Sequence, residues 1–181
     1  MRRPDDVVIS IATPDDVEQI ADIVRRSYSK LPPEQVPADM PIYHASYHAE
    51  AMADPHTRWR LLRDADGPAG VVMWRILPGF GHLHLLFIIG ESQGEGYGSL
   101  MLRTFAEAVR AEDPDARLLT LHCLADATRT IRFYRRHGYI QYNSGDEGRI
   151  IDLYLWLDAA EREGLGWPLR NDKLLFYKTL R

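Results

Sequence analysis

Apolar residues recur at two different spacings along the chain, and each spacing predicts a different kind of element. Thr13 and Pro14 supply a cap and a first helical residue, and apolar positions three or four apart then predict a helix that ends before Pro32. The same spacing predicts further helices, at 43–53, 99–112 and 126–137. Short apolar or alternating runs between turn-forming residues predict strands, at 7–12, 58–63, 70–76, 82–89, 117–123, 139–143, 150–157 and 174–180.

The order of these elements indicates how they pair. The segment 64–68 is rich in turn-forming residues and predicts a hairpin, and glycines at 79 and 81 break the chain before the next strand. The later strand-helix-strand order requires a parallel pair of strands. We therefore expect an α/β (α+β) fold. Because 181 residues are too few for two ordinary domains, we expect a single domain over residues 1–181.

Composition and charge narrow the class of protein. Apolar residues make up 45% of the chain and charged residues 27%, which is typical of a folded globular domain rather than a disordered tail. The single Cys123 cannot form an internal disulfide, and no run approaches the roughly 20 apolar residues that span a bilayer. A net charge of −4 gives no general attraction to nucleic acids or anionic membranes. We expect a cytoplasmic protein with neither kind of partner.

A glycine-rich turn, Gln93-x-x-Gly96-x-Gly98, lies between a predicted strand and a predicted helix. Glycines let the backbone approach an anion, and the first amides of a helix point toward it, so the turn is a candidate phosphate site. A P-loop is disfavoured because the turn holds no lysine, and the spacing differs from that of a dinucleotide-binding turn. A tight turn also needs such glycines for conformational reasons alone, and this alternative stays open.

The turn resembles the pattern of the GNAT superfamily of N-acetyltransferases, in which Arg or Gln is followed after two residues by Gly, any residue, and Gly or Ala. This resemblance implies a mixed, mainly antiparallel sheet of six to seven strands, flanked by helices and splayed in the middle. It implies that backbone N–H groups of the turn bind the pyrophosphate of acetyl-CoA and that the end of the preceding strand contacts the acetyl group and pantetheine arm. The residues so implied are Leu86, Phe87, Ile88, Gln93, Gly94, Glu95, Gly96, Tyr97, Gly98 and Ser99.

His82 and His84 alternate with Leu83 on a predicted strand, so both imidazoles face one side of it. A solvent-facing edge would explain two such rings. A metal site would need further ligands, such as the pair His44 and His48, and we expect no metal. Placed eleven and nine residues before the glutamine of the turn, the two rings resemble the paired histidines of serotonin N-acetyltransferase. This resemblance implies that they serve as, or relay protons to, the general base that deprotonates an acceptor amine.

Tyr134 precedes Gly138 and Tyr139 near the end of a predicted helix, which resembles the tyrosine and Gly-Phe or Gly-Tyr pattern of the same superfamily. The resemblance implies that its phenol lies by the coenzyme sulfur and protonates the departing thiolate. An aromatic side chain packed on the inner face of the helix is the structural alternative. Ala127 stands where members of the superfamily often have asparagine, so the affinity or pose of the coenzyme can differ.

Together these resemblances imply an N-acetyltransferase that moves an acetyl group from acetyl-CoA directly to a primary amine on a small molecule or a peptide. We expect the irregular segments 31–57 and 144–172 to shape the choice of acceptor. A homodimer is the oligomer we consider. Two other classes stay open: a non-catalytic acyl-CoA-binding or regulatory module, and a metal-dependent enzyme that uses the four histidines named above.

Overall fold

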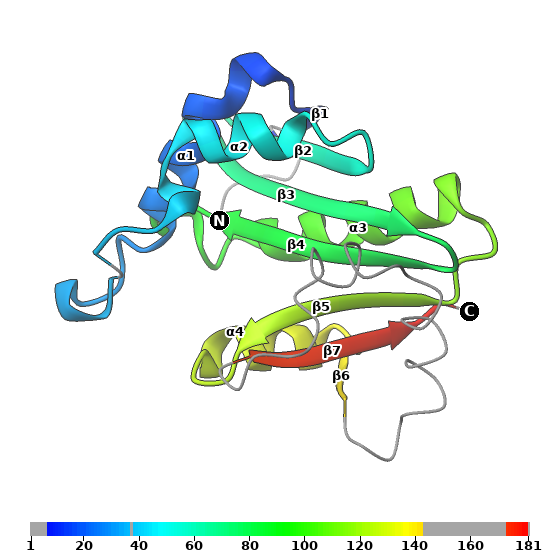
Figure 1. The fold of residues 1–181 in the computed structure, drawn as a ribbon. Helices are drawn as coiled ribbons and strands as arrows, with labels where there is room; N and C mark the ends of the chain where they lie inside the picture. Colours follow the sequence, from blue (N-terminus) through cyan, green and yellow to red (C-terminus); the bar gives the residue numbers. More distant parts are fainter. Residues whose placement is uncertain (1–6, 37, 143–172, 181) are drawn as a thin grey trace. The chain divides into compact units, whose positions relative to one another are not determined.

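The computed structural model describes residues 7–36, 38–142 and 173–180 (Figure 1). The strands are β1 (Val8–Ile11), β2 (Thr57–Asp64), β3 (Gly67–Leu77), β4 (Phe80–Ile88), β5 (Leu118–Leu124), β6 (Ile140–Gln141) and β7 (Lys173–Thr179). The α-helices are α1 (Val17–Ser27), α2 (Ala45–Met52), α3 (Tyr97–Glu112) and α4 (Thr128–Arg136). Short 3-10 helices are η2 (Pro14–Asp16), η3 (Pro33–Gln35), η4 (Pro41–Tyr43) and η5 (Gly90–Ser92). The strand expected at 150–157 lies outside the described residues.

Hydrogen bonds order the strands as β1-β2-β3-β4-β5-β7-β6 in a seven-stranded sheet. β4 and β5 run parallel, with His82 opposite Thr120, whereas β1 with β2, β5 with β7 and β6 with β7 form antiparallel pairs. A parallel pair was expected from the strand-helix-strand order of β5, α4 and β6, but the pair that forms joins β4 and β5, and β7 separates β5 from β6. The expected α+β fold with a mixed, mainly antiparallel sheet is therefore confirmed.

The chain forms two compact units. The first comprises residues 1–74 and 85–105, and the second comprises residues 75–84 and 106–181. β3, β4 and α3 each contribute residues to both units. The expectation of one domain over the whole chain stays a prediction.

In the first unit, the start of α1 is fixed by residues that the sequence analysis singled out. The Asp16 carboxylate accepts hydrogen bonds from the Thr13 backbone N–H at 2.8 Å and from the Thr13 hydroxyl at 3.1 Å. Pro14, which has no N–H to satisfy, opens the 3-10 turn η2 that leads into the α-helix. The buried face of α1 consists of Ile20, Ala21, Ile23 and Val24.

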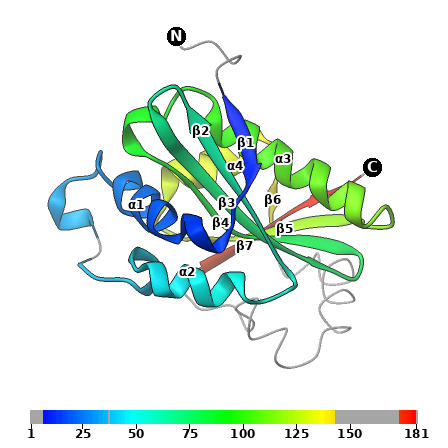
Figure 2. The same ribbon diagram turned by 90° about the horizontal axis from the view of Figure 1, so that it is seen from above.

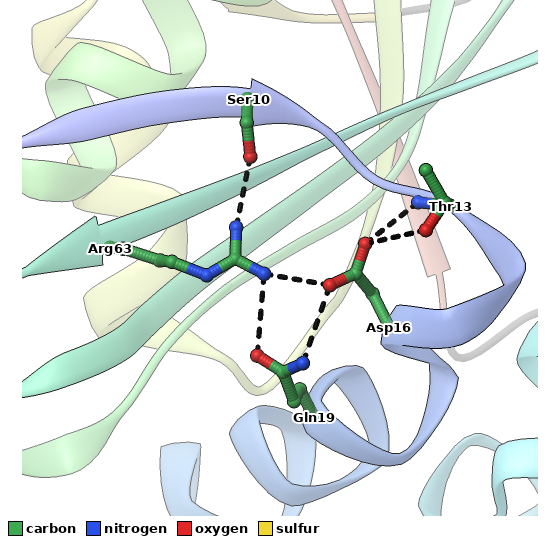
Figure 3. A network of polar contacts seen from close by, with 5 residues as sticks. All are labelled: Ser10, Thr13, Asp16, Gln19 and Arg63. Carbon is green, nitrogen blue, oxygen red and sulfur yellow. Dashed lines mark hydrogen bonds and ion pairs between the residues drawn. The ribbon is translucent and has the colours of Figure 1, made fainter.

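Arg63 on β2 extends this cap into a network that ties α1 to β1 and β2 (Figure 3). Its guanidinium donates to Asp16 Oδ1 at 2.7 Å and to Gln19 Oε1 at 3.3 Å. A further hydrogen bond at 2.9 Å reaches Ser10 Oγ on β1. Burial opposes the charge of Asp16, but the hydrogen bonds from Thr13 and the charge of Arg63 outweigh it and hold the pKa of this carboxyl below its ordinary value. The ion pair therefore persists at neutral pH and fixes where α1 begins.

The hairpin expected in this unit is present. β2 and β3 are neighbours in the sheet, and Asp66 donates its backbone N–H to Asp64 Oδ1 at 2.9 Å in the turn between them. Gly67, with a φ of 115°, adopts a backbone conformation that other residues rarely take. On the far side of β2, the strand β1 lies alongside it, as Figure 2 shows. The largest fully buried side chains of the unit are Ile20, Ile23, Leu61, Leu62, Trp74, Met101 and Phe105.

In the second unit, β5 is paired on both edges, with β4 on one side and with β7 along all of its own length (Figure 1). Its residues Leu118–Leu121 are all buried, as expected for a strand covered on both faces. α4 ends at Arg136, and Gly138 closes it two residues later with a φ of 80° and a backbone N–H bond to the Arg135 carbonyl, as its sequence predicted.

Several boundaries differ from those expected. α1 ends at Ser27, several residues before Pro32, where the helix was expected to stop. α3 begins two residues early, at Tyr97, because the Gly96 carbonyl already accepts a hydrogen bond from Leu100. β4 begins at Phe80, so the chain turns over fewer residues than expected. No helix in the described part of the chain is long and apolar enough to span a membrane.

Candidate active site

The glycine-rich turn in the first unit has the conformation that its residues predict. Gly94 and Gly96 have φ values of 105° and 89°, which exclude most other residues without strain. A Cβ built on either glycine would meet no atom within 4 Å, so the space beside the backbone is open. Gly94, Glu95 and Gly96 are exposed. The turn can therefore admit a bulky anion close to its main chain.

The N-terminus of α3 follows directly. The Leu100 N–H bonds to the Gly96 carbonyl at 3.1 Å, so the helical hydrogen-bond ladder starts there. The amides of Tyr97, Gly98 and Ser99 come before this first bond, at the end of the helix where N–H groups point outward. Together with the helix dipole they favour negative charge at this end.

Gln93 positions the turn by its side chain. Its amide Nε2 donates to the carbonyl of Ser27 at 2.9 Å and to that of Ile88 at 3.0 Å, which connects α1, the end of β4 and the turn. Lys30 Nζ donates to the Gln93 carbonyl at 3.4 Å. The resemblance implied that main-chain atoms of the turn contact the coenzyme. The Gln93 side chain instead supports the turn through these hydrogen bonds.

A second anchor lies on the other side of the turn. The Tyr97 side chain is buried, and its hydroxyl donates to Asp64 Oδ2 at 3.2 Å at the end of β2. The turn is thus held by both Gln93 and Tyr97, while Gly94 and Gly96 between them stay exposed.

The end of β4 carries Leu86, Phe87 and Ile88, of which Ile88 is buried and the other two are partly exposed. The Phe87 ring lies 6.2 Å from that of Tyr28, measured between centroids. Gly70 allows β3 to lie close to the end of β4. A Cβ at Gly70 would be 2.5 Å from Ile88 Cδ1 and 3.3 Å from the Phe87 carbonyl oxygen.

His82 and His84 face the same side of β4, as the alternation predicted, and both belong to the second unit. Their ring centroids are 4.7 Å apart in an edge-to-face arrangement. A solvent-facing edge does not account for them, because β4 lies between β3 and β5 and His82 is only 1% exposed.

The structure adds His122 and Thr120 on β5, which the sequence analysis did not single out. The His122 ring lies 5.0 Å from that of His82, and His82 Nδ1 is hydrogen-bonded to Thr120 Oγ1 at 2.8 Å. A signal was present: Thr120-Leu121-His122 repeats the polar-leucine-polar alternation of His82-Leu83-His84. In a parallel pair at this register, the polar members of both segments fall on one face.

Burial sets the charge state of these rings. Desolvation, and then the charges of His84, His122, Arg75 and Lys173, lower the pKa of His82 well below 6.5. Desolvation and Lys173 lower the pKa of His122 to about 4. Both rings are therefore neutral at neutral pH, the state in which an imidazole can accept a proton.

Tyr134 on α4 is 6% exposed and packs among aromatic rings in the second unit. Its centroid lies 5.2 Å from that of Phe133, 5.8 Å from that of Tyr139 and 6.4 Å from that of Phe176. Burial, followed by the nearby Cys123 thiol, raises the pKa of the Tyr134 hydroxyl above its ordinary value. The phenol therefore carries its proton at neutral pH, and burial makes it a weaker acid than an exposed tyrosine.

The structure also places Ala127, His44 and His48, which the sequence analysis singled out. Ala127 is the N-cap of α4 and provides no side-chain hydrogen bond to the helix. His44 bonds to Asp39 at 2.9 Å, and buried His48 bonds to the Ile42 carbonyl at 2.9 Å. Across the described ranges, no group of three or more His, Cys, Asp or Glu side chains is arranged to hold a metal ion.

Comparison with known proteins identifies a family. The family model described as "Acetyltransferase (GNAT) family" matches residues 17–139. Among curated proteins, the chain is 28% identical over 97 residues to the uncharacterized N-acetyltransferase YjcF of Bacillus subtilis (strain 168). That match covers 54% of this chain and 59% of the relative, so the chain spans about three fifths of that protein's length.

Solved structures share the fold at low sequence identity. The PaiA N-acetyltransferase of Thermoplasma acidophilum, crystallised in complex with coenzyme A, superposes with a TM-score of 0.68 at 11% identity, over 96% of this chain and 99% of that one. A variant of the SpeG spermidine N-acetyltransferase of Vibrio cholerae superposes with a TM-score of 0.61 at 11% identity, over 97% of this chain and 94% of that one.

Proposed function

Because the chain belongs to the acetyltransferase (GNAT) family, we propose that it transfers an acetyl group from acetyl-CoA directly to a primary amine. The observation that carries the proposal is the open, positive-φ glycine turn at the N-terminus of α3. The acceptor is a small molecule or a peptide that presents its amine to the site.

The turn fits a pyrophosphate group. The main chain at Gly94, Glu95 and Gly96 is exposed, and the two glycines place no Cβ beside it. The amides of Tyr97, Gly98 and Ser99 follow at the N-terminus of α3, the end of a helix that favours an anion. The main chain of Leu86, Phe87 and Ile88 is assigned to the acetyl group and pantetheine arm. When bound, acetyl-CoA supplies an acetyl thioester, which a neutral amine can attack.

The histidines of β4 handle the proton of the acceptor. An amine is mostly protonated at neutral pH and cannot attack until it loses a proton. His82 is neutral at that pH because burial lowers its pKa, so it is ready to accept one. Tyr134 has the opposite role: its phenol is protonated at neutral pH and donates to the thiolate that leaves, against the effect of burial, which raises its pKa and makes it a weaker acid.

Binding of acetyl-CoA tests the proposal first. The purified protein should be stabilised by about 2.7 kcal/mol when acetyl-CoA is present at one hundred times its dissociation constant, which thermal shift and calorimetry measure. Turnover is tested on a panel of small amines and peptides, with the release of free coenzyme thiol as the measured signal. Absence of binding would contradict the coenzyme site, whereas binding without turnover on any amine would favour the non-catalytic acyl-CoA-binding module.

Tyr134→Phe tests the acid. The change removes a hydroxyl and keeps the ring that packs against Phe176, so stability should hardly change. Turnover should fall, with coenzyme affinity unchanged, toward the lower end of the roughly 10²- to 10⁴-fold range of general acids, because a thiolate is already a fair leaving group. The deficit should grow with rising pH, since less of the departing thiol is then protonated by solvent.

Tyr139→Phe is the matched control for this experiment. Tyr139 is also buried, its ring lies 5.8 Å from that of Tyr134, and its hydroxyl has no hydrogen-bond partner among the described residues. Loss of that hydroxyl should leave turnover unchanged. Equal rates for Tyr134→Phe and the wild type at every pH, with chemistry shown to be rate-limiting, would assign Tyr134 to the core.

A further inference from the structure

The hydrogen bond between His82 and Thr120 joins two side chains that are each 1% exposed. A threonine hydroxyl can donate or accept, so the 2.8 Å contact is compatible with both neutral tautomers of the ring. In one, Nδ1–H donates to Thr120 Oγ1 and Nε2 keeps a lone pair. In the other, the hydroxyl donates to Nδ1 and Nε2 bears the hydrogen. A ring of the second kind cannot accept a proton at Nε2.

We infer that Thr120 is a positioning residue that holds His82 in the tautomer with its hydrogen on Nδ1, so that Nε2 is the atom that accepts the proton of the acceptor amine. The inference rests on the proposed function. The acceptor ammonium gives one proton to Nε2, and the amine nitrogen keeps the electron pair with which it attacks. Nδ1–H donates to Thr120 before and after this transfer, so the buried ring does not have to turn.

The surroundings of His82 make the neutral tautomer the state that matters. His84 faces it from the same strand at 4.7 Å and His122 faces it from β5 at 5.0 Å, both between ring centroids. Arg75 on β3 and Lys173 on β7 add positive charge. Because a resting imidazolium is disfavoured among these groups, the ring begins each turnover neutral, and only one of its nitrogens is then a base.

Imidazole NMR tests the assignment without any turnover. Long-range ¹H–¹⁵N correlation spectra of the ¹⁵N-labelled, ligand-free protein at neutral pH report which nitrogen of each neutral histidine bears the hydrogen. We expect Nδ1–H for His82 in the wild type and in Thr120→Ser, and a shift toward Nε2–H in Thr120→Val, which keeps the shape but lacks the acceptor. Nε2–H in the wild type would overturn the inference. This wild-type measurement decides the question even if Thr120→Val fails to fold.

Kinetics supply the functional readout. Thr120→Val should lower kcat/KM for the acceptor about tenfold and leave acetyl-CoA affinity unchanged, whereas Thr120→Ser should recover the rate to within about twofold. A wild-type rate in Thr120→Val with an altered tautomer would overturn the inference. If the wild type shows the expected tautomer but acetylates no amine, the tautomer assignment is supported and the proposed function is contradicted.

Discussion

Gly96→Asp is expected to abolish binding of acetyl-CoA. The substitution places a side chain in a space that is open now, and it forces aspartate into a φ of 89°. More important, it adds a negative charge beside the amides that should face the pyrophosphate, so the attraction at the start of α3 becomes repulsion. Isothermal titration calorimetry of the variant should show no heat of binding at concentrations that saturate the wild type.

Two companion variants separate charge from backbone strain. Gly67→Asp makes the same change at a φ of 115° in the β2–β3 turn, where a Cβ also meets no atom within 4 Å, and it should bind acetyl-CoA normally. Gly96→Ala adds strain without charge and should weaken binding less than Gly96→Asp. Normal binding of acetyl-CoA by Gly96→Asp would show that the pyrophosphate does not bind at this turn.

The fold was predictable because its local signals agree with one another. Thr13 and Pro14 predict the start of α1, and in the structure both lie at that point, where Thr13 bonds to Asp16. Gly138 predicts the end of α4 and adopts the positive φ that this role requires. Boundaries were less predictable, as at α3, where the Gly96 carbonyl begins the helix before the first apolar residue of the predicted pattern.

The candidate site was predictable only where its residues are neighbours in sequence. His82 and His84 share a strand, and their common face follows from the period of two. Thr120 and His122 reach the same cluster through strand pairing, and the register that sets Thr120 opposite His82 is decided by packing. The depressed pKa of His122 likewise arises from burial and from Lys173, which lies some fifty residues further along the chain.

Replacing both His82 and His84 by glutamine should lower turnover at neutral pH by roughly 10²-fold or more, the effect of losing a general base. Glutamine keeps hydrogen-bonding capacity and similar bulk but cannot take up a proton at this pH. Acetyl-CoA affinity should stay the same, because the residues assigned to the pyrophosphate belong to the turn and to α3. Each single variant should lose less, since the remaining ring can still accept a proton.

Both kcat/KM and the free energy of unfolding should fall as the pH drops below neutrality. Because the pKa of His82 is depressed below 6.5, the acid limb of wild-type kcat/KM should lie below that value and disappear in the double variant. In the unfolded chain, histidines bind protons with a pKa of about 6.5. The unfolded state therefore binds a proton at pH values where native His82 stays neutral, so the free energy of unfolding should fall as the pH drops through 6.5 toward the native pKa. The double variant should show a shallower loss in chemical unfolding over that range.

His137→Gln is the control for both measurements. His137 lies at the end of α4, where its Nδ1 contacts the Phe133 carbonyl at 3.0 Å, a bond that a glutamine amide can replace. This variant should keep the wild-type rate and the wild-type acid limb. If the double variant retained full activity from pH 6 to 9, His82 and His84 would be structural, and the proton of the acceptor would leave by a route that does not involve the β4 histidines.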